Sequence, residues 1–143
     1  MGKYMKVKSI TKIGKEPIFS IQNNEKDLYK DQPNFFTEGC LSKNSKHACV
    51  HKDSLVSTQR GKVPISKLEE NDKIAYLDSN HEIKLTKKYD LINTGRKKLF
   101  KVKLKDGKEL IITEEHELFN KFEGESESTK LKKLKVGDEI VVF

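Results

Sequence analysis

Apolar residues alternate with charged ones along much of the chain, and this period of two is typical of strands in a half-exposed β-sheet. The clearest case is a pair of alternating runs, Leu99–Lys105 and Lys108–Thr113, joined by Asp106-Gly107. Both residues of this dipeptide tolerate the positive φ angles of a tight turn, so the pattern predicts a β-hairpin. Further strands are predicted at Met5–Ile13, Pro17–Gln22, Phe35–Leu41, Leu55–Thr58, Lys73–Leu77, Glu82–Asn93 and Glu139–Phe143. The predicted fold class is therefore all-β.

Helical patterns are short and few. Pro64–Asn71, with Ser66 as an N-cap, and Lys130–Lys135 each predict one or two helical turns. The segment Glu123–Thr129 contains no apolar residue, which predicts a mobile surface loop. A second polar stretch, 42–48, lies between predicted strands and directly precedes a cysteine. We therefore expect the reactive residues of the chain near this stretch.

Length and composition narrow the class of protein. The chain has 143 residues, the size of one domain, and with 34% hydrophobic and 36% charged residues it has a thin core. It contains neither an apolar run long enough to cross a membrane nor an apolar leader at its start, so we expect a cytoplasmic protein without a membrane partner. The net charge of +7 permits binding to polyanions. Because the basic residues alternate with apolar ones, as on a solvated sheet face, we expect no nucleic-acid partner.

Two motifs carry residues that are able to do chemistry. Cys49 precedes a predicted strand, and one of the two cysteines could serve as a nucleophile because two are too few for a disulfide scaffold. Thr113 and His116 follow the predicted hairpin, where they could hydrogen-bond a carbonyl and protonate an amide nitrogen. Each motif alone is more typical of a structural role, since a cysteine before a strand is usually a small buried hydrophobe.

Taken together, and with Asn44-Ser45 upstream, these motifs resemble the inteins, self-splicing protein elements with the Hint fold. The resemblance covers nearly the whole chain, but the two halves stand in exchanged order. Residues 49–143 are similar to the amino-terminal half of an intein, and residues 1–44 to the carboxy-terminal half. The matching positions are Cys49, Asp53, Val56, Thr58, Gly61, Gly107, Thr113 and His116 in the first case, and Ile18–Ile21, Asn34–Gly39 and Asn44 in the second.

The resemblance implies one horseshoe-like Hint domain over 1–143, circularly permuted, with the bridge 45–48 (Ser-Lys-His-Ala) in the place of the spliced host sequence. The abrupt bridge favours an engineered permutation. The natural connection would run from Phe143 back to the first residues, which predicts that the two chain ends lie close together. The implied protein is a monomer that acts on its own residues Ser45–Ala48 and needs no cofactor and no metal.

The resemblance also implies a role for each site residue. Cys49 attacks the carbonyl of Ala48, while Thr113 orients the bond and His116 protonates the departing nitrogen. Ser45 then attacks the resulting thioester. Finally, the side-chain amide of Asn44 attacks its own carbonyl and separates Asn44 from Ser45.

Two departures from the family pattern and the short bridge limit the expected reaction. Lys43 stands at the penultimate position, where the family commonly has a histidine, so the second cleavage is expected to be slow. Gln32-Pro33 stands where an acidic residue and a histidine are often found, and Asp31 could substitute only after a shift of the loop. Complete splicing would close a strained four-residue ring, so we expect an unspliced precursor.

Several other interpretations remain open at this stage. Cys40, His47, Cys49 and His51 are metal-ligand types, but their spacing is not that of structural zinc sites. We expect Cys40 in the core, His81 in an exposed turn, and Asp53 as a structural hydrogen-bond acceptor. The alternative function is a small basic β-module that binds nucleic acid through lysine-rich strands. Cleavage without ligation is a further enzymatic alternative.

Overall fold

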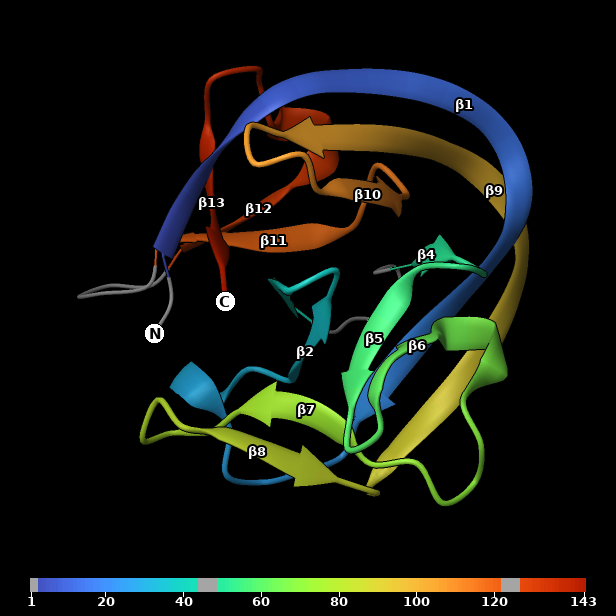
Figure 1. The fold of residues 1–143 in the computed structure, drawn as a ribbon, viewed down its shortest axis with the longest axis vertical. Coiled ribbons are helices and arrows are strands. Elements are labelled where there is room, and N and C mark those ends of the chain that lie inside the picture. Colours follow the sequence, from blue (N-terminus) through green and yellow to red (C-terminus); the bar gives the residue numbers. More distant parts are fainter. Residues whose placement is uncertain (1–2, 44–48, 122–126) are drawn as a thin grey trace.

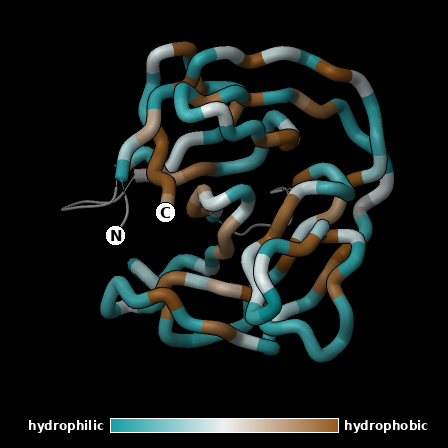
Figure 2. The backbone as a smooth tube through the Cα atoms, viewed as in Figure 1, coloured by the Kyte–Doolittle hydropathy of each residue, from teal (hydrophilic) through white to brown (hydrophobic). Residues whose placement is uncertain are grey.

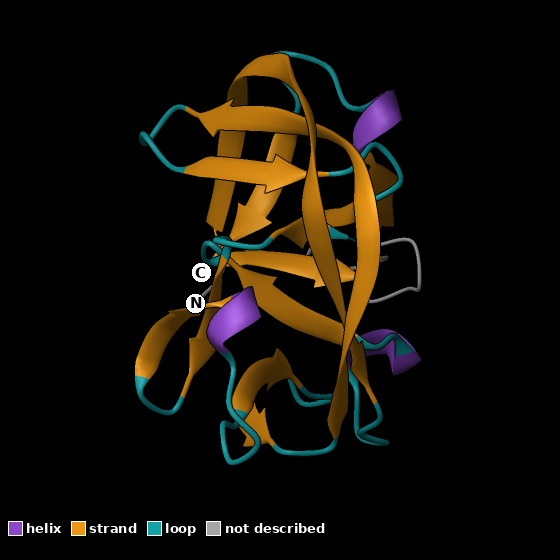
Figure 3. Cartoon of the chain, turned by 90° about the vertical axis from the view of Figure 1, so that its right-hand side faces the viewer, coloured by secondary structure: helices purple, strands orange, loops and turns teal. Residues whose placement is uncertain are grey.

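The computed structural model describes residues 3–43, 49–121 and 127–143. Within these residues the protein is all-β, as predicted: thirteen strands connect through antiparallel pairings, and the helical elements are three short 3-10 turns. Figure 3 shows the strands running through the body of the molecule and the helical turns on its outside. The described residues contain no helix that is both long and apolar enough to cross a membrane.

Two long strands, β1 (Lys3–Asn23) and β9 (Tyr89–Leu104), pair along nearly their whole length and curve together around one side of the molecule (Figure 1). Hydrophobic and hydrophilic residues alternate along this pair (Figure 2), because successive side chains of a strand point to opposite faces. The sequence predicted two strands, Met5–Ile13 and Pro17–Gln22, where β1 is continuous. Gly14, with a φ of 101°, lies at one of three register shifts, and this bulge lets β1 bend without ending.

The hairpin predicted at Asp106-Gly107 is confirmed. β9 turns there into β10 (Glu109–Ile112), and Gly107 has the positive φ, 95°, that such a turn needs. β10 ends directly before Thr113. The hairpin therefore sets the place at which the 113–116 turn begins.

The run Phe35–Leu41, predicted as a single strand, forms two strands. β2 (Asn34–Thr37) and β3 (Cys40–Lys43) pair as a hairpin around Glu38-Gly39, whose φ angles are 52° and 78°. Two positive φ values in succession are typical of a two-residue hairpin turn. The carboxylate of Glu38 also accepts a hydrogen bond from the Leu55 N–H at 2.8 Å, which ties the turn to a neighbouring strand.

The run Glu82–Asn93, also predicted as one strand, is divided as well. β8 (Ile83–Thr86) pairs with β7 (Ile74–Leu77), while the residues from Tyr89 onward belong to β9. The hydroxyl of Thr86 accepts a hydrogen bond from the Lys88 N–H at 2.9 Å. Such a local side-chain bond competes with the strand ladder and redirects the chain.

The remaining elements are short. Both predicted helical segments contain a 3-10 turn, and the predicted strands at Leu55–Thr58 and near the C-terminus are present. The loop predicted at Glu123–Thr129 is wrong in part, because its last three residues begin a strand that pairs with β11. These elements are β4 (Val50–His51), β5 (Leu55–Thr58), β6 (Gly61–Pro64), β11 (Glu117–Lys121), β12 (Glu127–Lys130), β13 (Glu139–Val142), η1 (Tyr29–Asp31), η2 (Ile65–Lys67) and η3 (Leu131–Lys133).

The two ends of the described chain lie side by side (Figure 1), as the sequence predicted. Lys3 at the start of β1 is the register partner of Val142 at the end of β13. Phe143 continues from there, donating its N–H to the Gly39 carbonyl at 2.8 Å and packing its ring against Phe36. A direct connection between the ends would therefore be short.

The main core lies between the curved β1–β9 pair and the strands that it encloses. It is built from the inward-facing residues of nearly every strand, and its members are mostly Val, Ile and Leu. A smaller cluster around the fully buried Tyr29 packs under the β2–β3 hairpin. A third cluster contains Ile18, Leu99 and Cys49, so the cysteine singled out by the sequence is part of a packed interior.

Candidate functional site

Cys49 lies directly before β4, and its placement follows from the pairing of the next residue. Val50 pairs with Phe19 of β1 on one side and with Ile112 of β10 on the other. Because Val50 is fully buried between these two strands, the residue before it is also drawn into the interior. Cys49 is fully buried, with a reduced thiol.

Thr113 holds the backbone of Cys49 by two hydrogen bonds. Its N–H donates to the Cys49 carbonyl oxygen at 3.1 Å, and its hydroxyl donates to the same oxygen at 3.3 Å. This carbonyl belongs to the peptide bond after Cys49, whereas the bond expected to break lies before it. These two contacts therefore fix the position of Cys49 itself.

His116 lies at the end of the same turn and is fully buried. Its N–H donates to the Thr113 carbonyl at 3.1 Å, and its own carbonyl accepts from the Leu131 N–H at 2.9 Å. The ring of Phe35 lies edge-on to the imidazole, with a centroid distance of 6.5 Å. Backbone bonds thus hold the main chain of His116, and Phe35 packs against its ring.

Burial controls the charge of His116. Loss of water around the ring lowers its pKa from 6.5 to about 4, and the backbone of Cys49, as a hydrogen-bond partner, acts more weakly in the opposite direction. The imidazole is therefore neutral at physiological pH. A neutral imidazole carries one N–H donor and one acceptor nitrogen, which suits a relay of protons.

The third strand that reaches this turn is β3. The hydroxyl oxygen of Ser42 lies 2.9 Å from Nε2 of His116, and both residues are fully buried. The next residue, Lys43, forms an ion pair with Glu117 of β11 at 3.3 Å. Sequence reasoning singled out Lys43 but missed Ser42, although the period of two in Cys40–Lys43 turns Ser42 to the same side as the buried Cys40.

Asn44, Ser45 and Ala48, to which the sequence analysis assigned further chemistry, lie outside the described residues, as does His47. The structure describes the two flanks of the bridge. Lys43 ends β3, and Cys49 precedes β4. Ser42 contacts His116 and Cys49 contacts Thr113, so both flanks converge on the 113–116 turn.

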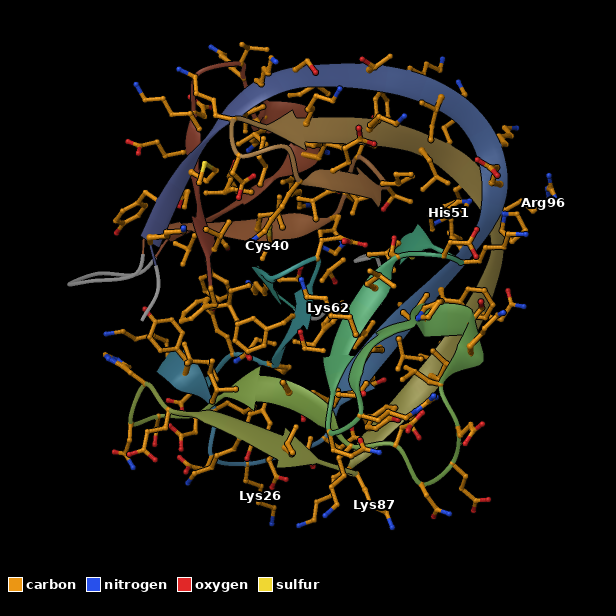
Figure 4. All side chains as sticks on the ribbon, viewed as in Figure 1. Lys26, Cys40, His51, Lys62, Lys87 and Arg96 are labelled. Atoms are coloured by element: carbon orange, nitrogen blue, oxygen red, sulfur yellow. The ribbon has the colours of Figure 1, made fainter. Side chains whose placement is uncertain are left out.

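His51, labelled in Figure 4, forms a separate polar cluster with Asp53 and with Glu16 of β1. Nε2 of His51 lies 3.1 Å from the Glu16 carboxylate, and the Asp53 N–H donates to Nδ1 of His51 at 3.1 Å. The Asp53 side chain is 64% exposed and its nearest oxygen lies 3.9 Å from that nitrogen. Asp53 therefore contributes mainly a backbone donor here, where a structural acceptor was expected.

Cys40 is buried in β3, as predicted for a core residue. Burial raises the pKa of its thiol to about 12, so the side chain is protonated and unreactive. His81, predicted in an exposed turn, is exposed and has a φ of 63°. Among residues 3–43, 49–121 and 127–143, no three His, Cys, Asp or Glu side chains form a group that could hold a metal ion.

A shallow cavity of about 310 Å³ opens beside the 113–116 turn. Its basic side consists of Lys15 of β1 and of Arg96, Lys97 and Lys98 of β9. The other side is formed by residues 113–115, which include two glutamates. Figure 4 shows Arg96 pointing outward from the curved β1–β9 pair, so this basic edge faces solvent.

Comparisons with known proteins give a partial match. No protein-family model matches the chain. Over 99 residues, 68% of the chain, it is 33% identical to DNA topoisomerase 1 of Pyrococcus furiosus. The chain spans about 9% of the length of that protein. The shared segment is therefore a small part of the relative.

Proposed function

We propose that the chain is a self-processing element of the intein type, with a Hint-type fold in circularly permuted order, and that it breaks its own peptide bond before Cys49. The observation that carries the proposal is the double hydrogen bond from Thr113 to the Cys49 carbonyl, across 64 positions of sequence, beside a buried neutral His116. Cleavage of an amide needs a fixed nucleophile and a proton for the leaving nitrogen. Cys49, directly before β4, and His116 in the 113–116 turn are proposed to supply these groups.

In the first step the Cys49 sulfur attacks the Ala48 carbonyl carbon, and the bond from that carbon to the Cys49 nitrogen breaks. The imidazole of His116 gives a proton to this nitrogen and takes up the proton that the thiol loses. The products are a thioester at Ala48 and a free amine at Cys49. No external reactant is consumed, because the acyl group moves from nitrogen to sulfur within one residue.

The second junction requires Ser45 and Asn44. The Ser45 oxygen displaces the Cys49 sulfur from the thioester and forms an ester. The side-chain nitrogen of Asn44 then attacks its own carbonyl carbon, which closes a succinimide and releases the Ser45 amine. Lys43 is a poorer proton carrier than histidine near neutral pH, so this step is the slower one.

Two further observations support the permuted order. Lys3 pairs with Val142, so the ends at which natural halves would join are adjacent. Both flanks of the bridge meet at the same turn, as a peptide held between two reacting junctions requires.

From Asn44 to Cys49 there are five Cα steps, at most about 19 Å of extended chain. Ligation would close a four-residue ring that peptide planarity strains. The proposed reaction therefore stops before ligation. In this proposal the chain is a single domain and acts without a cofactor.

The test is incubation of the purified chain with a small thiol, followed by mass spectrometry of the products. The proposal predicts fragments 1–48 and 49–143, with fragment 1–44 appearing later as Asn44 cyclises. Cys49→Ala removes the first pair of fragments. Cys40→Ala, which changes the other buried cysteine, is the matched control and retains them. A parent chain that stays at 16.5 kDa, or a Cys49→Ala chain that is still cut before position 49, refutes the proposal.

A second candidate function is binding of nucleic acid. It is favoured by the basic side of the cavity beside the turn, formed by Lys15, Arg96, Lys97 and Lys98, and by the partial match to a DNA topoisomerase. Against it, the cavity contains Glu114 and Glu115, and the described residues that line it include no aromatic ring on which a base could stack. Affinity for single-stranded DNA that falls steeply with salt, in a chain that thiol leaves intact, would establish this alternative.

A further inference from the structure

Ser42 and His116 form a buried polar pair that connects β3 to the 113–116 turn. The Ser42 oxygen and Nε2 of His116 are 2.9 Å apart, and neither side chain is exposed to water. β3 is fixed on both sides of Ser42, which pairs with Phe35 of β2 and with Leu118 of β11. The hydroxyl is therefore held in place by two neighbouring strands.

The other ring nitrogen of His116 is in a different situation. Nδ1 is buried and makes no hydrogen bond of normal geometry to the described part of the chain. The backbone of Cys49 lies close enough to raise the pKa of the ring, as a hydrogen-bond acceptor does. Since Nε2 is occupied by Ser42, Nδ1 is the nitrogen left for the Cys49 side of the ring.

A neutral imidazole has two tautomers, and its hydrogen bonds select between them. The Ser42 hydroxyl can rotate to donate a hydrogen bond or to accept one. If it donates to Nε2, then Nε2 carries no proton and the proton of the neutral ring lies on Nδ1. If Nε2 held the proton instead, Nδ1 would carry a lone pair and could not protonate the Cys49 nitrogen. The proposed cleavage therefore needs the tautomer that a donating serine favours.

We propose that the Ser42 hydroxyl donates its hydrogen to Nε2 of His116 and thereby keeps the imidazole proton on Nδ1, facing Cys49. Ser42 is a positioning residue in this scheme, because it acts through His116 and does not touch the scissile bond. The inference rests on the proposed cleavage. It links β3, the strand that leads to Asn44, with the His116 imidazole, which serves the first junction.

The direct test is the tautomer of His116, measured by long-range ¹H–¹⁵N NMR of the full chain carrying Cys49→Ala, which keeps the sample intact. We expect a protonated Nδ1 and an unprotonated Nε2. In Ser42→Ala the ratio of the two tautomers falls by about tenfold toward the Nε2–H form, the effect of removing one neutral hydrogen bond. Ser20→Ala is the matched control, because Ser20 is equally buried and its hydroxyl makes no hydrogen bond to the described residues.

Ser42→Cys gives a second variant that preserves volume and adds no buried void. A thiol is a weak donor, so the tautomer ratio moves in the same direction as in Ser42→Ala. The His51 signals, which come from a separate cluster, report whether either variant is folded. In the chain with Cys49 present, Ser42→Ala and Ser42→Cys slow thiol-induced cleavage by about tenfold, while Ser20→Ala does not.

A parent chain with the proton on Nε2, or folded Ser42 variants that keep the Nδ1–H form, overturns the inference. These readings do not need cleavage. If the parent never cleaves but shows the Ser42-dependent tautomer, the proposed function fails and the hydrogen bond stands as described. If the parent cleaves and its tautomer ignores Ser42, the proposed function stands and the role of Ser42 is refuted.

Discussion

The burial of His116 makes a quantitative prediction about how stability depends on pH. Its pKa in the folded chain is about 4, against 6.5 in the unfolded chain. Between these values the unfolded chain binds more protons than the folded one, so stability falls as the pH is lowered through this window. The full difference corresponds to about 3 kcal/mol at roughly 1.4 kcal/mol per pKa unit.

The perturbation is His116→Gln, which removes the titrating group and keeps a polar side chain of similar size. Between pH 7 and pH 4.5, protonation of His116 in the unfolded chain lowers the free energy of unfolding by about 2 kcal/mol. Urea unfolding of the parent and the variant at both pH values measures it, with Cys49→Ala in both chains to prevent cleavage. Carboxylates that titrate in this range cancel when the two chains are compared.

His81→Asn provides the control for this experiment. His81 is exposed, and Asn tolerates its positive φ, so this variant removes a histidine without removing a buried one. We expect the His81→Asn chain to keep the pH dependence of the parent. If His116→Gln and His81→Asn lose stability with falling pH as steeply as the parent, the imidazole is not desolvated, and the argument from burial is refuted.

Three further predictions concern the turn, the core and the second junction. Gly39→Ala lowers the free energy of unfolding, measured by urea titration, by about 1–2 kcal/mol, because φ is 78° and a Cβ would meet the Phe143 carbonyl at 3.3 Å. Gly107→Ala lowers it less in the same titration, because a Cβ at this position would meet open space. Ile112→Ala lowers it by about 2–5 kcal/mol, since Ile112 is fully buried against β4. Lys43→His speeds release of fragment 1–44, followed by mass spectrometry; an unchanged rate would show that the lysine is not what limits this step.

Local patterns in the sequence were sufficient for elements whose turns have a strong signature. Asp106-Gly107 between two alternating runs gives the β9–β10 hairpin, because Gly107 takes the positive φ angle that the turn needs. Glu38-Gly39 also makes a hairpin turn, with a positive φ at both residues, but glutamate is a weak turn signal, and the apolar residues on both sides look like one strand. The turn at Glu38 is held by its carboxylate bond to Leu55, a partner 17 residues away that no local pattern identifies.

The full length of β1 could not be predicted from local patterns, because here the sequence indicates two strands where the structure has one. Gly14 and Pro17 interrupt the alternating pattern, and strands usually have about 5–6 residues. Pairing with β9 from Val7 to Asn23 supplies a partner on both sides of the interruption, so the strand bends at bulges and continues. A continuous strand of 21 residues is thus a property of the pair and not of either segment.

The sequence alone determined the residue types of the candidate site, its spacing along the chain, and the all-β character of the fold, because strand periodicity and chemical reactivity are both local properties. It also predicted that the chain ends would be neighbours. Only the tertiary structure decided that His116 is neutral, that Thr113 holds the carbonyl after Cys49, and that Ser42 is the partner of the imidazole. Desolvation and hydrogen-bond geometry depend on which strands meet, and here β3, β4 and β10 come from three separate parts of the chain.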